Sequence, residues 1–241
     1  MKRVKNFLFL LLAAPVVAFA SGPSVHLDKA PVNLADHESL QRGARMFVNH
    51  CLNCHSASAM RYSRLQDIGL TEDQIKDNLL FSAEKPGELM KVAMTRSDGK
   101  LWFGATPPDL SVIARSRGAD WLYTYLRSFY RDDTRPTGWN NTVFDKVGMP
   151  HVLWSLQGEL VPVYAKHGGH EVIERLELAK PGSVTLAEYD AMIGDLVNYL
   201  VWMGEPAQMQ RKQLGVVVLA FLAFFFVVAY YLKKEFWKDV H

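Results

Sequence analysis

The feature that most constrains this chain is the motif CLNCH at residues 51–55, which holds both of its cysteines. A C-x-x-C-H motif is typical of covalent attachment of a c-type haem. Two thiols three positions apart, on a turn or a short helical segment, can each form a thioether with one vinyl group of the haem. The adjacent histidine then lies beneath the ring, where an imidazole nitrogen can bind the iron. The motif therefore predicts one covalent haem c per chain, held by Cys51, Cys54 and His55.

Three other uses of a cysteine pair fit the sequence less well. A structural zinc site requires four Cys or His ligands, usually from two such pairs, and the sequence has no second cysteine pair. A thioredoxin-like redox pair is expected within a βαβ unit, whereas the flanks of this motif have a helical pattern. A disulfide would close too short a loop to stabilise the fold by much.

Residues 1–20 are predicted to be a secretory signal peptide. They have a basic start, an apolar run at 7–12 and the sequence AFA at 18–20, which resembles a cleavage site. A retained N-terminal anchor is the alternative, but the apolar run is short and is followed by Pro15. Export would place the haem site outside the cytoplasm, in an oxidising compartment.

A second apolar segment, residues 214–232, is predicted to span a membrane. Its 19 residues carry no charge, and as a helix they would reach about 28 Å, enough to cross a hydrocarbon core. The segment is apolar on every face, which argues against a buried core helix. Lys233, Lys234 and Lys238 favour the cytoplasmic side, although the basic residues at 211–212 weaken that argument. The signal peptide gives the same orientation.

These two segments divide the chain into a signal peptide at 1–20, an exported haem domain at 21–206 and an anchor with a short tail at 207–241. Residues 21–210 carry 19 basic and 23 acidic side chains, a net charge of −4. A mildly acidic exported domain argues against nucleic-acid binding and permits docking of a basic partner. Its length suits one domain with its own core.

Apolar periodicity predicts two long helices in this domain. One has Asp36 as its N-cap and an apolar face that extends from Leu40 to Cys51. Gly43 within this helix predicts that another element passes close by. The other lies near 186–203 and begins with a capping-box pattern at 185–188. We expect this second helix to be the element that packs against Gly43.

A helix pair is predicted at 109–130, with Trp121, Tyr125 and Phe129 on one face. The sequence HGGH at 167–170 is flanked by β-forming residues from Val161 to Leu178, which predicts a hairpin over that stretch. The domain is therefore expected to be mainly α with one small hairpin.

The second axial ligand is open among several residues. Met149 lies in the sequence VGMP, where glycine lets the backbone approach the haem ring and proline stiffens the loop. Met90 and Met94 lie in a predicted helix and compete with it, and His151 is a further candidate. The loop context favours Met149.

A set of short motifs is spread along the chain: RG at 42–43, CLNCH at 51–55, MRY at 60–62, PPDLS at 107–111, MP at 149–150, NYL at 198–200 and EP at 205–206. Taken together, these motifs resemble the cytochrome c1 family. The resemblance covers nearly the whole chain after the signal peptide, including the C-terminal span. The fold it implies is mainly α, a cytochrome c-like haem domain with a small β-hairpin insertion and one C-terminal transmembrane helix.

The resemblance also implies roles for single residues. Met149 becomes the second axial ligand, Pro108 packs against the haem, and Arg117 binds a haem propionate. Arg115 is the alternative partner for the propionate, since a guanidinium at either position can reach a carboxylate. The family pattern is not matched within 155–182, so no role is assigned to that region.

By the same resemblance, the chain is an electron-transfer subunit of the quinol–cytochrome c reductase (bc1) complex, with no substrate chemistry of its own. The implied donor is the Rieske iron–sulfur protein, the acceptor is a c-type cytochrome, cytochrome b is the membrane neighbour, and the complex is dimeric. The expected location is the bacterial inner membrane, with the haem domain in the periplasm. The alternatives are a stand-alone membrane-tethered c-type carrier and a haem enzyme or gas sensor with an open sixth site.

Overall fold

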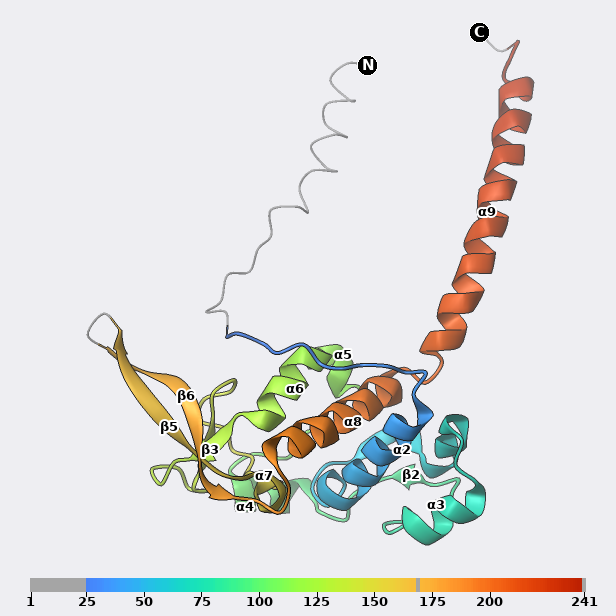
Figure 1. Cartoon of the computed structure of the whole chain (residues 1–241). Coiled ribbons are helices and arrows are strands. Elements are labelled where there is room, and N and C mark those ends of the chain that lie inside the picture. The colour runs from blue at the N-terminus through green and yellow to red at the C-terminus, as the bar shows by residue number, and fades with distance from the viewer. Residues whose placement is uncertain (1–24, 168–169, 240–241) are drawn as a thin grey trace.

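The computed structural model describes residues 25–167 and 170–239 (Figure 1). The predicted signal peptide lies outside the described residues. The helices are α2 (His37–Met46), α3 (Glu72–Asn78), α4 (Arg96–Phe103), α5 (Ile113–Arg117), α6 (Ala119–Arg127), α7 (Trp154–Gln157), α8 (Leu186–Gly204) and α9 (Gln208–Phe236), with a π-helical turn η2 (Phe47–Cys51) and a 3-10 segment η3 (Tyr62–Ile68). The strands are β1 (Ala57–Arg61), β2 (Leu89–Met90), β3 (Phe129–Arg131), β4 (Trp139–Asn141), β5 (Gly158–His167) and β6 (His170–Pro181).

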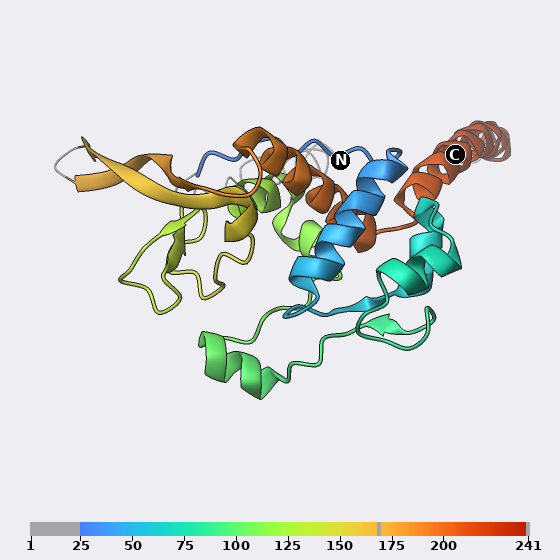
Figure 2. The same ribbon diagram turned by 60° about the horizontal axis from the view of Figure 1, so that its bottom comes forward.

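The central element of the haem domain is α8, which lies between α2 on one side and α5 and α6 on the other (Figures 1 and 2). Most of its apolar residues are buried, among them Ile193, Leu196 and Tyr199. The ring of Tyr199 packs 5.6 Å from the ring of Phe47, at the end of α2. The predicted fold class, mainly α with a small hairpin and a C-terminal apolar helix, is confirmed.

The predicted caps of both long helices are confirmed. Asp36 accepts a hydrogen bond from the backbone N–H of Ser39 at the start of α2. Thr185 and Glu188 form a capping box at the start of α8, in which each side chain accepts from the other's backbone N–H. These bonds satisfy N–H groups that have no partner within the first turn of a helix.

The close approach expected at Gly43 is also confirmed. A Cβ atom added at Gly43 would lie 2.1 Å from the backbone oxygen of Asp195 and 2.6 Å from the Cβ of Tyr199, both on α8. Beside this contact, Arg42 donates two hydrogen bonds to the Asp195 carboxylate, at 2.6 and 3.0 Å. Glycine is therefore required for the observed spacing of the two helix backbones.

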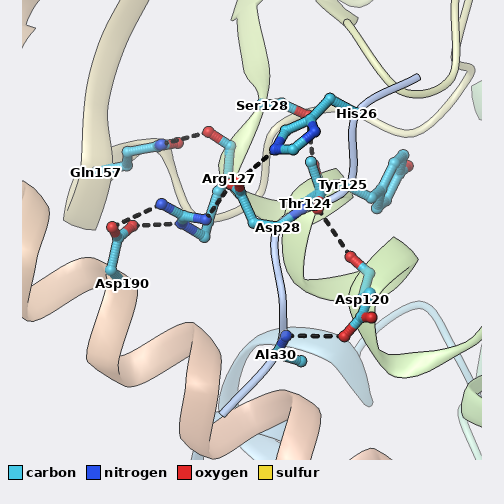
Figure 3. Close-up of polar contacts among 10 residues, drawn as sticks. All are labelled: His26, Asp28, Ala30, Asp120, Thr124, Tyr125, Arg127, Ser128, Gln157 and Asp190. Carbon is cyan, nitrogen blue, oxygen red and sulfur yellow. Dashed lines mark hydrogen bonds and ion pairs between the residues drawn. The ribbon is translucent and has the colours of Figure 1, made fainter. Parts of the chain in front are cut away.

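An ionic cluster joins α6, α8 and the N-terminal segment (Figure 3). The guanidinium of Arg127 binds both carboxylate oxygens of Asp190, at 2.6 and 2.7 Å, and the carboxylate of Asp28 at 2.7 Å. The backbone oxygen of Arg127 accepts from Gln157, at 2.9 Å. Such paired, charge-assisted bonds fix orientation as well as distance. They hold α6 in place against α8.

Two of the predicted elements differ from the structure. The helix pair expected at 109–130 is shorter, because α5 starts only at Ile113, Gly118 separates α5 from α6 with a φ of +90°, and Phe129 lies in β3, paired with Asn141. Asp109 lies before α5, and its carboxylate accepts from the backbone N–H groups of Ser58 and Ser111.

The helix expected around Met90 and Met94 is wrong as well. Met90 lies in β2 and pairs with Ala57 of β1, while Met94 precedes α4, whose N-cap is Thr95. The helical spacing of the two methionines therefore does not produce a helix, because Met90 pairs with β1 and the next helix begins only after its Thr95 cap.

The predicted hairpin is confirmed and is longer than its sequence pattern indicated. Strands β5 and β6 are antiparallel, and their pairing extends from Gly158 opposite Pro181 to His167 opposite His170. The hairpin projects from the body of the domain (Figures 1 and 2).

Helix α9 leaves the domain and projects away from it (Figure 1). Among the residues that the structure describes, it is the one helix long and apolar enough to cross a membrane, and its most apolar window is 0% buried within the chain. A fully exposed apolar helix of this length is stable in a bilayer but not in water.

We predict that Gly43→Ala destabilises the haem domain by about 1–3 kcal/mol, because the added methyl would overlap the backbone of α8. The gain in helix propensity, about 1 kcal/mol, does not offset that clash. Thermal unfolding followed by the haem absorbance measures the effect. The matched control is Gly87→Ala, where nothing lies within 4 Å of the added Cβ. Equal melting temperatures for the two variants would contradict the close contact.

Candidate functional site

The C-x-x-C-H motif forms a tight turn at the end of α2. The helix widens into the π-helical turn η2, in which the N–H of Leu52 donates to the oxygen of Phe47, at 2.9 Å. The N–H groups of Cys54 and His55 then donate to the oxygen of Cys51, at 3.1 and 2.9 Å. Cys51 and Cys54 are not joined in a disulfide. A π-helical turn often marks a functional site in a helix, and this one carries Cys51, the first cysteine of the motif.

The imidazole of His55 is held by a residue far away in sequence. Its Nδ1 lies 2.8 Å from the backbone oxygen of Pro108. A carbonyl oxygen only accepts hydrogen bonds, so Nδ1 carries the proton and donates it. The other ring nitrogen, Nε2, is then unprotonated and has a lone pair to bind a metal. A histidine that binds a metal commonly has this kind of backbone partner on its second nitrogen.

The six predicted site residues line one cavity of ≈ 300 Å³. They are Cys51, Cys54, His55, Pro108, Arg117 and Met149. The remaining wall is mainly apolar, with Leu122 and Leu126 from α6 and Leu196 and Leu200 from α8. The cavity therefore brings together side chains from 51–55, the 103–108 segment, α5, α6, α8 and the loop around 149.

Of the four candidate axial ligands, all of which the structure describes, Met149 lines this cavity. The sulfur of Met90 is fully buried elsewhere and accepts a hydrogen bond from Tyr199, at 3.7 Å. Met94 lines a separate cavity of ≈ 140 Å³ behind Cys54. The loop context that favoured Met149 in the sequence is matched by its position.

His151 points into the protein interior instead. Its ring is 2% exposed, stacks on Phe129 with centroids 4.9 Å apart, and meets the ring of Trp139 at 5.0 Å. Burial lowers the pKa of His151 to about 4, so the imidazole is neutral near pH 7. The aromatic neighbours fix the loop two residues after Met149.

The two candidate arginines have different surroundings. Arg115 forms an ion pair with Glu205, at 3.2 Å. Arg117 lines the cavity, with its guanidinium 5.2 Å from the centre of the Trp121 ring. A guanidinium over an aromatic face keeps its charge and its donors available to an anion. The arrangement favours Arg117 as the arginine that reaches a group in the cavity.

Burial also determines the charge of the haem-binding groups. It raises the pKa of the Cys51 thiol to about 12, with a smaller contribution from Cys54, and it raises the pKa of Cys54 as well. It lowers the pKa of His55, against the opposing effect of the Pro108 hydrogen bond. The site therefore presents neutral thiols and a neutral imidazole at pH 7.

Two cavity residues were not recognised as site residues from the sequence. Trp121 and Tyr125 line the cavity from α6, and the Tyr125 hydroxyl lies 3.4 Å from the Met149 sulfur. Their spacing of four residues is visible in the sequence. Aromatic residues at helical spacing are more often core residues, and this pattern alone does not separate the two cases.

The described residues fit a covalently bound haem c. One apolar cavity is lined by the side chains of two cysteines, by an imidazole and by a methionine sulfur. The Nδ1 atom of the imidazole is held by a backbone carbonyl. Thiols and the imidazole lie in one turn, as attachment of one macrocycle requires.

Comparison with known proteins gives the family. The model of the Cytochrome C1 family matches residues 28–162 and 178–240. The chain is 50% identical over 235 residues to cytochrome c1 of Allochromatium vinosum, covering 96% of each chain. It is 51% identical over 241 residues to a Nitrosomonas europaea protein named ammonia monooxygenase gamma subunit, covering 100% of each. The mitochondrial cytochrome c1 haem protein of Neurospora crassa is 27% identical over 230 residues, covering 84% of this chain and 62% of that protein.

The two most similar of these relatives carry different names, and the family model matches the name cytochrome c1. The match includes the C-x-x-C-H turn, the Pro108 segment, Met149 and the apolar helix α9. It leaves out residues 163–177, in the hairpin whose sequence could not be matched to the family pattern. On sequence and on the residues gathered at one cavity, the chain belongs to the cytochrome c1 family.

Proposed function

We propose that this cavity binds one haem c, with Cys51 and Cys54 as the covalent attachment points and His55 and Met149 as the axial ligands. The observation that carries the proposal is that all four side chains line one cavity although Met149 is almost a hundred positions from the motif. When bound, haem c supplies a one-electron ferric–ferrous couple.

Each residue of the site then has a defined task. The two cysteines hold the edge of the ring, and the Pro108 carbonyl keeps the His55 ring in the tautomer that presents Nε2. Arg117 binds a propionate, in preference to Arg115, which is paired with Glu205. The leucines of α6 and α8 exclude water, which favours the less charged ferrous state.

The function of the family follows from this site. A cytochrome c1 is a haem c protein and an electron-transfer subunit of the bc1 complex, where it works with cytochrome b and the Rieske protein. We infer that this chain takes one electron from the Rieske iron–sulfur protein and passes it to a c-type cytochrome. We assign no substrate chemistry to the chain itself, because its site binds and tunes a redox group.

The chain is anchored in the membrane by its C-terminal helix α9. We propose that residues 1–20 direct export, that the haem domain spans 21–206 in the periplasm of a bacterium, and that 207–241 cross the inner membrane and end in the cytoplasm. Basic residues in the last turn of α9, Lys233 and Lys234, support this orientation.

We predict that Cys51→Ala or Cys54→Ala weakens covalent retention of the haem, and that the double variant abolishes it, because each thioether fixes one edge of the ring. Haem staining after denaturing electrophoresis measures retention. Full staining of the double variant would exclude covalent attachment at this motif.

We predict that Met149→Leu leaves the haem attached but lowers its midpoint potential strongly. Leucine matches the volume of methionine, so the loss of stability is at most about 1.5 kcal/mol, whereas the thioether sulfur, a soft ligand that favours ferrous iron, is removed. The ferric Met–iron charge-transfer band should disappear, and the reduced protein should bind carbon monoxide.

Met94→Leu and His151→Ala are the controls for this ligand assignment. Both residues are close in sequence or space to the site but lie outside the cavity. Each variant should keep the band. If either control loses it and Met149→Leu does not, the ligand is that residue.

We also predict that a reporter enzyme fused after His241 is active only if it is a reporter that works in the cytoplasm. The exported domain precedes α9, which is the one candidate membrane span among the residues that the structure describes. Activity of a reporter that requires the periplasm would reverse the orientation. A fusion placed after Ala207, before α9, is the matched control and should give the opposite pattern.

A further inference from the structure

The hydroxyl of Tyr125 is directed at the proposed axial ligand. It donates a hydrogen bond to the Met149 sulfur, at 3.4 Å, and both side chains line the haem cavity. A thioether sulfur is only a weak acceptor, and Tyr125 is 8% exposed. The strength of this hydrogen bond alone therefore does not explain why a buried tyrosine hydroxyl has the sulfur as its partner. The contact lies at the atom that is proposed to bind iron.

The position of this hydroxyl is fixed by the aromatic rings on both sides. The Tyr125 ring stacks on Trp121 with centroids 4.7 Å apart and planes within 12°, and the edge of Phe129 meets it at 5.0 Å. Tyr125 lies on the opposite side of α6 from the Arg127 cluster, which holds that helix in place (Figure 3). The phenol therefore has little freedom to turn away.

The same segment is tied to the loop that carries Met149. Asn141, which is 1% exposed, donates to the backbone oxygen of Tyr125, at 2.8 Å. Its side-chain oxygen accepts from the N–H groups of Val143 and Phe144, at 2.8 and 3.1 Å. One buried amide thus links the helix that presents the hydroxyl to the start of the methionine loop.

A thioether sulfur has two lone pairs. If one is directed at iron, the other can accept a hydrogen bond, and donation from a hydroxyl withdraws electron density from the sulfur. A sulfur with less density stabilises ferric iron less, which favours the ferrous state.

Resting on the proposed ligation by Met149, we infer that Tyr125 is a positioning residue that orients the Met149 sulfur and raises the potential of the haem. The chain's aromatic column, Trp121, Tyr125 and Phe129, supports this hydroxyl as well as filling the core. The tuning acts through the ligand, since Tyr125 contacts the sulfur.

The chain contains a matched control. Tyr199 also donates a buried hydroxyl to a methionine sulfur, that of Met90, at 3.7 Å, and neither of these residues lines the haem cavity. Both residues of that pair are completely buried. Tyr199→Phe therefore removes the same kind of hydrogen bond as Tyr125→Phe, at a similar loss of stability. The Tyr199 hydroxyl does not contact the proposed ligand.

The test measures midpoint potentials of the full-length haem-loaded protein for Tyr125→Phe and Tyr199→Phe. Loss of one hydrogen bond shifts an equilibrium by up to about tenfold, which for one electron is a fall of up to about 59 mV. We expect this fall in Tyr125→Phe and an unchanged potential in Tyr199→Phe. Equal potentials in wild type and Tyr125→Phe, with the ferric Met–iron band retained, would overturn the inference while leaving the ligand assignment intact.

A double variant separates this inference from the proposed ligation. In a Met149→Leu background, Tyr125→Phe should leave the potential unchanged, because the route through the sulfur is gone and the two effects are not additive. If Met149→Leu keeps the Met–iron band, the ligation itself fails. If Tyr125→Phe lowers the potential equally in both backgrounds, Tyr125 acts on the haem by another route and the inference is wrong.

A second substitution covers the case in which Tyr125→Phe does not retain haem. A fluorinated tyrosine introduced at position 125 keeps the ring and the hydroxyl but has a more acidic phenol, which is a stronger donor. We expect the midpoint potential to rise above that of the wild type. A fall or no change would contradict the inference.

Discussion

The contact of α2 with α8 at Gly43 sets the geometry of the haem domain. Because no side chain separates the backbones there, the position of α2 relative to α8 is fixed at closest approach. Helix α2 ends in the turn that carries Cys51, and α8 supplies Leu196 and Leu200 to the opposite part of the cavity wall. The distance between the C-x-x-C-H turn and the apolar wall therefore follows from one helix–helix contact. The Arg42–Asp195 ion pair beside this contact fixes the rotation of α2 relative to α8.

The remaining parts of the site depend on bonds between segments that are distant in sequence. The Pro108 carbonyl orients His55 from 53 positions away, and the Asp109 carboxylate accepts from the backbone of Ser58 next to the motif. The 105–111 segment therefore packs across the C-x-x-C-H turn and holds it through these two hydrogen bonds. Its two consecutive prolines, Pro107 and Pro108, lack backbone N–H groups, but their carbonyl oxygens can still accept hydrogen bonds.

The sequence predicted those parts of the structure that depend on local chemistry. The two caps, the glycine contact, the haem motif, the apolar span and the hairpin each involve a residue type whose backbone or ligand preference is strong. Pairing partners were less predictable. Met90 and Phe129 were both assigned to predicted helices, yet each lies in a short strand whose partner is elsewhere in the chain. Tyr125 shows the same limit at the site, since its i, i+4 spacing with Trp121 is equally consistent with a core face. Its contact with Met149 depends on how the loop after β4 folds back.

The hairpin has a consequence for how this chain can change. It leaves the domain at Gly158 and returns at Gly182. A Cβ atom added at Gly158 would lie 2.3 Å from the backbone oxygen of Lys180, and one added at Gly182 would lie 2.0 Å from the backbone oxygen of Leu156. Two strands that part and rejoin at so narrow a neck can gain or lose pairs of residues without moving either end. The segments that join this arm to the domain therefore do not fix its length. The family match, which stops at residue 162 and resumes at 178, is interrupted within this arm.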